Sequence, residues 1–146
     1  MNQPPNQLPA SSFQSPTLIT GVGGFIASHL AERLLREGVR VRGTARQTFE
    51  VSETSKVSFA SKVSRGVEVV QADLLDAGSL RRAADGCRAV VHAAAWTGGP
   101  ELSEELAWRT NVEGTANMLA AARAAGVERF VYISSIAVYG DRKSVV

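Results

Sequence analysis

The chain has 146 residues, of which 45% are hydrophobic and 21% are charged. This composition excludes a disordered or collagen-like protein, and no apolar run approaches the roughly 20 residues of a membrane-spanning helix. Sixteen basic and 14 acidic residues leave a net charge of only +2, which does not indicate nucleic acid as a partner. The single cysteine, Cys87, excludes an intramolecular disulfide framework and a multi-cysteine zinc site, and it favours a reducing, cytoplasmic compartment.

The N-terminal segment differs in composition from the rest of the chain. Residues 1–16 are uncharged and rich in Pro, Gln, Asn and Ser. They lack the basic start and apolar centre of a signal peptide. We therefore expect a disordered leader over residues 1–16 and a folded domain over residues 17–146.

From Thr17 onward, short apolar runs alternate with longer amphipathic stretches. The runs are continuous and mostly rich in Val and Ile, which is typical of strands that are buried on both faces of a parallel sheet. The five predicted strands are Thr17–Thr20, Val39–Thr44, Val67–Gln71, Ala89–Ala93 and Arg129–Ser134.

Three helices are predicted between these strands. The first spans Gly24–Glu37, where apolar residues recur every four positions. A short second helix follows Ser79, a candidate N-cap, and runs to Ala84. The third spans Ser103–Ala125 and ends before a glycine. Its apolar side is formed by the alanine-rich residues 120–125 together with Trp108, Val112 and Leu119.

Residues 47–65 are Ser-rich and weakly periodic, and they should hold a further crossover helix or a long loop. Five strands joined by helices imply right-handed β-α-β crossovers. The predicted fold class is therefore α/β, a Rossmann-type doubly wound parallel sheet. Five strands of it are present, and we expect its C-terminal strands and substrate region to be missing from this sequence.

A glycine-rich turn, TGVGGFIASHL at residues 20–30, lies between the first strand and the first helix. Gly21, Gly24 and Ala27 form a G-x-x-G-x-x-A pattern. Gly21 permits a tight turn, and Gly24 lets the backbone approach a pyrophosphate at the helix N-terminus. No Lys-Ser/Thr pair follows, which excludes a P-loop. In this context the turn predicts a dinucleotide site rather than a turn without a ligand.

Four further motifs follow in order: ADL at 72–74, HAAA at 92–95, NVEGTAN at 111–117 and SSIAVYG at 134–140. With the glycine turn, this series resembles the extended short-chain dehydrogenase/reductase family, which contains sugar-nucleotide epimerases and dehydratases, 3β-hydroxysteroid dehydrogenases and dihydroflavonol reductases. The resemblance implies an NAD(P)-binding domain over residues 17–146 and hydride transfer between a nicotinamide and a hydroxyl or carbonyl substrate. It favours a reductase or hydroxysteroid-dehydrogenase-like activity over an epimerase. The alternative is a non-catalytic dinucleotide-binding or sensing module.

The end of the second strand bears on the choice of dinucleotide. NAD-binding relatives place an acidic residue there, whereas this chain reads VRGTAR at residues 41–46, with no acid before Glu50. A carboxylate would repel the 2′-phosphate of NADP, and a guanidinium group binds it through paired hydrogen bonds. Arg46 therefore favours NADP, with NAD as the alternative, unless Arg42 and Arg46 are only solvated loop charges.

The resemblance also implies the residues that contact the cofactor. Small alanines after the fourth strand suit a cofactor that passes close over the strand ends. Asp73 is ambiguous, because an aspartate at a strand end can serve only as a turn or cap residue. The implied contacts are Gly21, Gly23, Gly24, Phe25, Ile26, Arg46, Asp73, Leu74, Ala93, Ala94 and Ala95.

The resemblance implies two catalytic residues, Ser135, which matches the family's serine that hydrogen-bonds the substrate oxygen, and Asn111, which matches its helix asparagine, unless Asn111 is an ordinary polar helix residue. Tyr139 and Lys143 have the Tyr-x-x-x-Lys spacing of the family's acid/base pair. However, this tyrosine directly follows the fifth strand, and a glycine at position 140 disfavours the helix that the pair requires. We therefore expect the catalytic pair after the last residue of this sequence, and little activity in the chain alone.

Other candidates are weaker. His29 and His92 lie on separate elements without a ligand pattern, so no metal site is expected, and both are predicted to pack or cap. Cys87 is predicted to be an inert core thiol. Trp96 either shapes the substrate cleft or packs beneath its loop. The expected partners are a small-molecule substrate and, in a homodimer, a second copy of the chain, without nucleic acid or membrane.

Overall fold

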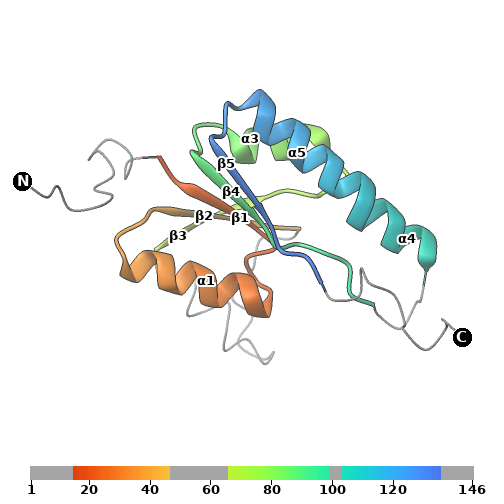
Figure 1. Ribbon diagram of the computed structural model, residues 1–146, viewed down its shortest axis with the longest axis horizontal. Coiled ribbons are helices and arrows are strands. Elements are labelled where there is room, and N and C mark those ends of the chain that lie inside the picture. The colour runs from red at the N-terminus through yellow and green to blue at the C-terminus, as the bar shows by residue number, and fades with distance from the viewer. Residues whose placement is uncertain (1–14, 47–65, 99–102, 136–146) are drawn as a thin grey trace, which may run out of the picture.

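A computed structural model describes residues 15–46, 66–98 and 103–135. Five strands form one parallel sheet in the order β3-β2-β1-β4-β5 (Figure 1). This order confirms the predicted α/β doubly wound sheet. Residues 1–14 of the predicted leader and the whole of residues 47–65 lie outside the described residues. The strands are β1 (Thr17–Thr20), β2 (Val41–Ala45), β3 (Val67–Gln71), β4 (Ala89–His92) and β5 (Arg129–Tyr132).

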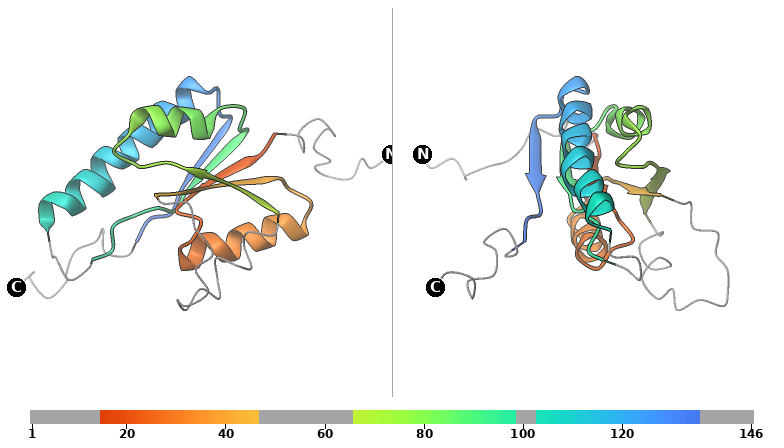
Figure 2. Two further views of the ribbon diagram at one scale, coloured as in Figure 1. Left: turned by 180° about the vertical axis from the view of Figure 1, so that it is seen from behind. Right: turned by 90° about the vertical axis from the view of Figure 1, so that its right-hand side faces the viewer.

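Helices cover both faces of this sheet (Figure 2). One face carries α1 (Phe25–Arg36). The other carries α3 (Ala77–Ala84) and a longer helical segment that packs beside it. That segment consists of α4 (Glu104–Trp108), the π-helical turn η2 (Arg109–Glu113) and α5 (Gly114–Ala124).

The central strand β1 has neighbours on both edges and helices over both faces. Leu18 is fully buried in the cluster under α3 and α5, and Ile19 is fully buried in the cluster under α1. Successive side chains of a strand point to opposite faces. Both faces of β1 therefore need apolar residues, which explains the consecutive apolar pair Leu18 and Ile19 at its centre.

The long helix differs from the prediction in two ways. It is interrupted by η2, and three residues of its predicted apolar side are exposed: Trp108 is 62%, Val112 45% and Leu119 47% accessible. The alanine run of that side does contribute to the buried face, which is formed by small residues and one methionine. These buried residues are Gly114, Met118, Ala121 and Ala122.

The start of α3 also corrects the prediction. Asp76, not Ser79, is the N-cap, and its side chain accepts the backbone N–H groups of Gly78 and Ser79 at 2.9 and 3.2 Å. These hydrogen bonds, led by the one from Ser79, lower the pKa of the Asp76 carboxyl. Ser79 lies buried inside the helix, where its hydroxyl donates to the carbonyl oxygen of Asp76 at 2.8 Å.

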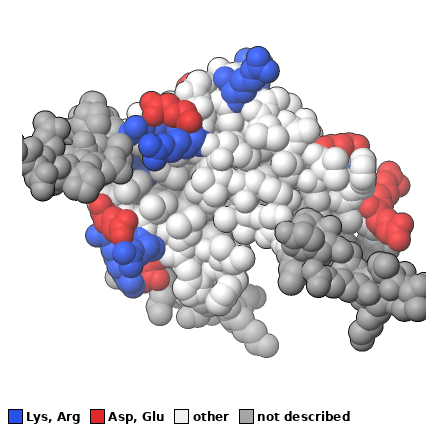
Figure 3. Space-filling model, viewed as in Figure 1, with Lys and Arg blue, Asp and Glu red and all other residues white. Residues whose placement is uncertain are grey.

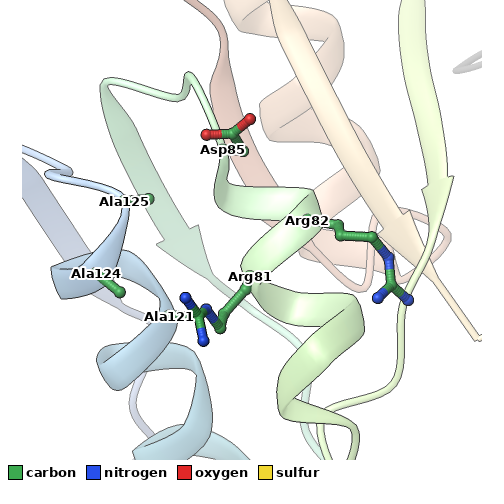
Figure 4. Close-up of a pocket in the computed structure, with 6 residues that line it drawn as sticks. All are labelled: Arg81, Arg82, Asp85, Ala121, Ala124 and Ala125. Carbon is green, nitrogen blue, oxygen red and sulfur yellow. The ribbon is translucent and has the colours of Figure 1, made fainter.

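The surface around β5 and α5 carries few charges. In Figure 3 the charged side chains lie toward the edges of the face shown, and its centre is uncharged. Val131 and Tyr132 of β5 are both half exposed, because β5 is the edge strand next to β4. A shallow hollow of about 270 Å³ lies between α3 and α5, where Arg81 extends toward α5 and Arg82 points away (Figure 4). It is remote from the glycine turn and contains none of the predicted site residues.

Candidate dinucleotide site

A pocket of about 600 Å³ lies at the carboxyl ends of the strands, beside the N-terminus of α1. The strand order reverses between β1 and β4, and open α/β sheets bind ligands at such a switch point. The pocket is lined by Gly21, Gly24, Phe25, Ile26, Ala27, Thr44, Ala45, Arg46, Ala72, Asp73, Leu74, Leu75, Ala93, Ala94, Ala95, Trp96, Thr97, Leu106 and Thr110.

The structure brings the predicted cofactor-contacting residues together from four strand ends. Of the eleven that the resemblance implied, only Gly23 does not line the pocket; it lies exposed in the turn. Trp96 does line it, which favours its role in shaping the cleft. Sequence reasoning missed Thr44, Leu106 and Thr110, which have no motif of their own and reach the pocket only through the fold.

The glycine turn packs between the segment that follows β4 and strand β2. Gly21 has a φ of +67°, and a Cβ atom there would lie 3.0 Å from both Cα and Cβ of Ala94. On the other side, the Val22 N–H donates to the carbonyl oxygen of Thr44 at 3.0 Å, and the Val22 side chain rests against Gly43 of β2. The turn therefore has a defined position relative to both walls of the pocket.

The N-terminus of α1 is open toward the pocket. Its N-cap is Gly24, which offers no side chain to the first helical N–H groups, and its first turn contains no acidic residue. Phe25 and Ile26 beside it are 73% and 56% exposed. A helix start of this kind carries a partial positive charge that favours an anionic group. The cradle of glycines and small residues thus fits a dinucleotide pyrophosphate.

The two arginines of the VRGTAR segment have different surroundings, since Arg42 lies near the start of β2 and Arg46 directly follows its end. Arg42 is largely buried, forms an ion pair with Glu68, and donates to the carbonyl oxygens of Ala83 and Asp85 at 3.0 and 2.7 Å. It is therefore a structural residue rather than a solvated loop charge. Arg46 is exposed, lines the pocket, and has no guanidinium hydrogen bond among the described residues.

Asp73 closes a turn and also lines the pocket, while its contact with the cofactor stays a prediction. Its Oδ1 atom accepts the N–H of Leu75 at 2.8 Å, which closes the turn after β3. The residue is nevertheless exposed and lines the pocket. Its neighbour Leu74 is buried against Gly114, where a Cβ atom would lie 2.7 Å from the leucine Cβ. This close approach brings the long helix up to the pocket.

The predicted catalytic residues do not line the pocket. The amide of Asn111 is bonded to the backbone of Trp96: it accepts the tryptophan N–H at 2.7 Å and donates to its carbonyl oxygen at 3.0 Å. Ser135 follows the carboxyl end of β5, the same end of the sheet at which the pocket lies, and is exposed. Tyr139 and Lys143 lie outside the described residues. The catalytic roles of Asn111 and Ser135 thus stay predictions.

His92 and Cys87 are both core residues, as predicted. His92 is fully buried between β1 and the long helix, with hydrogen bonds to Thr20 and Thr115. Cys87 is a buried free thiol whose pKa is raised, chiefly by burial. A raised pKa keeps the thiol protonated at neutral pH, so Cys87 is a poor nucleophile.

The burial of His92 predicts a loss of stability in acid. Burial lowers its pKa from 6.5 to about 4, so the unfolded chain binds this proton more readily than the folded protein. We expect the contribution of neutral His92 to the free energy of unfolding to be complete above pH 6.5 and to be lost progressively as the pH falls toward 4. Urea unfolding at pH 7, 5.5 and 4.5 measures it. The His92→Gln variant should show a shallower pH dependence, and an unchanged one would contradict the assignment.

Two further features concern the described residues only. No group of three or more His, Cys, Asp or Glu side chains among them is arranged to hold a metal ion. In the same part of the chain, no helix combines the length and apolar character needed to cross a membrane.

A model of the NAD dependent epimerase/dehydratase family matches residues 17–145. The chain belongs to this family. The matched range includes the glycine turn and all five strands, and the result confirms the resemblance seen in the motifs.

Two named relatives show how far the similarity of this chain extends. Cinnamoyl-CoA reductase 1 of Petunia hybrida is 43% identical over 125 residues, which are 84% of this chain and 36% of the relative. A putative dihydroflavonol 4-reductase of Synechocystis is 34% identical over 84% of this chain and 33% of its own length. The chain thus spans about a third of the curated relatives that it matches.

The fold is shared with a solved short-chain dehydrogenase/reductase superfamily protein of Agrobacterium tumefaciens with bound NAD. The two are 32% identical with a TM-score of 0.69, over 85% of this chain and 34% of that one. A UDP-glucose-4-epimerase of Stenotrophomonas maltophila, with bound NAD and formylated UDP-arabinopyranose, is 28% identical with a TM-score of 0.72. That match covers 86% of this chain and 38% of the epimerase.

Proposed function

We propose that this chain is the dinucleotide-binding part of an NADP(H)-dependent reductase of the epimerase/dehydratase family. The observation that carries the preference for NADP is Arg46. It lines the same pocket as the glycine turn, at the end of β2, and its guanidinium has no other hydrogen bond among the described residues. A guanidinium in this position suits the 2′-phosphate that distinguishes NADP from NAD.

Different residues of the pocket would contact different parts of the cofactor. The N-terminus of α1, with Gly21 and Gly24, would receive the pyrophosphate. Asp73 and Leu74 would contact the adenine, and the alanines after β4 would line the ribose and nicotinamide side. The bound dinucleotide would supply the hydride, which is exchanged with a carbonyl or hydroxyl carbon of the substrate.

A reductase is favoured over a sugar-nucleotide epimerase by the named relatives. The cinnamoyl-CoA reductase is 43% identical to this chain, whereas the UDP-glucose-4-epimerase is 28% identical. Neighbours solved with bound NAD support a nicotinamide dinucleotide in general. Trp96, at the far end of the pocket wall from the glycine turn, would shape the substrate side of the cleft.

Charge reversal at Arg46 tests the cofactor preference. We expect Arg46→Glu to weaken NADPH binding about tenfold or more, because a carboxylate repels the 2′-phosphate, while NADH binding is retained. The measurement is fluorescence titration of each variant with NADPH and NADH. Arg129→Glu is the matched control, since it makes the same charge change at the start of β5, at the opposite ends of the strands from the pocket, which Arg129 does not line. Equal affinities of the wild type for both dinucleotides, or tighter NADH binding, would contradict the proposal.

A non-catalytic dinucleotide-binding module is the second candidate, since neither Ser135 nor Asn111 lines the pocket. We expect the 146-residue chain to bind NADPH but to show little turnover of any alcohol or ketone. A coding sequence that continues past Val146 to a Tyr-x-x-x-Lys pair would support the reductase, and its absence would support the module. Robust turnover by the chain alone would instead assign the acid/base role to Tyr139 and Lys143.

A further inference from the structure

The pocket wall after β4, Ala93–Trp96, is held at both ends by side chains from other elements. At one end, the N–H groups of Ala93 and Ala94 both donate to Oγ1 of Thr20, each at 3.0 Å. At the other end, the amide of Asn111 binds both the N–H and the carbonyl oxygen of Trp96. The direction of this wall is therefore set from β1 and from the π-helical turn η2.

The two anchors are connected through His92. Thr20 Oγ1 lies 2.8 Å from Nδ1 of His92, and Nε2 of the same ring lies 3.0 Å from Oγ1 of Thr115. The Thr115 hydroxyl lies 2.6 Å from the carbonyl oxygen of Asn111. A path of hydrogen bonds thus runs from Oγ1 of Thr20 to the backbone carbonyl of Asn111, the residue whose side chain forms the second anchor, with a fully buried imidazole at its centre.

The available protons and lone pairs allow the hydrogen bonds of this path to donate in only one direction, from Thr20 toward Asn111. The hydroxyl of Thr20 already accepts two N–H groups with its two lone pairs, so its single proton must go to Nδ1 of His92. Nδ1 is therefore an acceptor, and a neutral ring then carries its proton on Nε2. That N–H donates to Thr115, whose own proton goes to the carbonyl oxygen of Asn111. The reverse tautomer would place two protons between Thr20 and His92.

We propose that His92, as the neutral Nε2–H tautomer, is a positioning residue of the dinucleotide site. It holds Thr20 and Thr115 in the orientations that place the pocket wall Ala93–Trp96. A residue that only filled space would not need two ring nitrogens in hydrogen bonds. The rings of Phe130 and Tyr132 pack against the imidazole, with centroids 6.1 and 5.7 Å from its own. The consequence for ligand affinity rests on the proposed function, whereas the tautomer and the order of the wall do not.

The matched variants separate polarity from packing. His92→Phe preserves an aromatic ring but removes both ring nitrogens, so the hydroxyl of Thr20 loses its acceptor and that of Thr115 loses its donor. Phe130→Leu changes the packing against the imidazole while leaving every hydrogen bond of the path in place. Thr115→Val is a milder change that cuts the path on the Nε2 side only.

Three measurements test the proposal. Nitrogen-15 NMR of the wild-type ring at pH 7 should show a protonated Nε2 and an unprotonated Nδ1. Hydrogen exchange at the amides of Ala93, Ala94 and Trp96 should accelerate at least tenfold in His92→Phe, with exchange in α1 unchanged. NADPH affinity should fall about tenfold in His92→Phe, less in Thr115→Val, and stay unchanged in Phe130→Leu.

The outcomes distinguish this inference from the proposed function. A wild type that binds neither NADPH nor NADH would overturn the proposed function, while the ring tautomer and amide exchange would still decide the role of His92. An Nδ1–H tautomer would overturn the inference, as would NADPH binding and exchange that are unaffected in His92→Phe. Equal affinity losses in His92→Phe and Phe130→Leu would assign the effect to packing and overturn it too. If His92→Phe does not fold, Thr115→Val and the wild-type tautomer decide.

Discussion

Replacing Gly21 with alanine is expected to lower the affinity for NADPH at least about a hundredfold. The residue has a φ of +67°, and the new Cβ would lie 3.0 Å from both Cα and Cβ of Ala94. Neither partner atom can rotate away, because one is backbone and the other is attached directly to it. The turn and the wall after β4 would have to separate, and both line the pocket. Titration of NADPH fluorescence measures the loss.

The effect of placing alanine at a positive φ must be distinguished from the effect of its contact with Ala94. Gly126 supplies the control, since its φ is +70° and a Cβ atom added there would have nothing within 4 Å. Gly126→Ala should lose about 1 kcal/mol of unfolding free energy in urea and keep normal NADPH affinity. A comparable affinity loss in both variants would show that the contact with Ala94 is not what matters.

Replacing Gly43 with alanine is expected to cost about 3 kcal/mol of unfolding free energy. A Cβ at this position of β2 would lie 2.6, 2.7 and 2.8 Å from Cγ1, Cβ and Cγ2 of Val22. The valine is only 1% exposed and cannot move toward solvent. Its backbone is also tied to β2, because its N–H donates to Thr44. Urea unfolding followed by circular dichroism measures the change.

A double-mutant cycle identifies the cause of that loss. Val22→Ala removes the two γ-methyl groups but leaves its Cβ, so it should relieve the clash in part. The double variant Gly43→Ala, Val22→Ala should therefore be more stable than the sum of the single effects predicts, by about 1 kcal/mol or more. Strictly additive effects would show that the valine is not the group that excludes a side chain from position 43.

The sheet was readable from the sequence because its strands are buried on both faces. The two central residues of β1 and three of the four residues of β4 are apolar, so these strands appear as short apolar runs, and the structure places them within one or two residues of the prediction. The glycine turn was readable for a different reason. Gly21 and Gly24 are separated by a short spacing that the local geometry of a strand-turn-helix unit requires.

The features that sequence reasoning missed depend on contacts between distant residues. Gly43 has a meaning only beside Val22, and His92 only between Thr20 and Thr115, which lie 72 and 23 positions away. The start of α3 was misplaced because Asp76 and Ser79 are both good N-cap residues, and the backbone path decides between them. The helix face was predicted only in part: the alanine run contributes Ala121 and Ala122 to the buried face, but the large side chain of Trp108 is exposed.

The position of β1 in the middle of the sheet bears on how the chain is made on the ribosome. One edge of β1 pairs with β2, which follows within about thirty residues, but the other pairs with β4, beginning at Ala89. During synthesis from the N-terminus, the second edge of β1 stays unpaired until the residues of β4, Ala89–His92, have emerged. The switch point between β1 and β4, where the pocket lies, therefore cannot form before β4 has been synthesised.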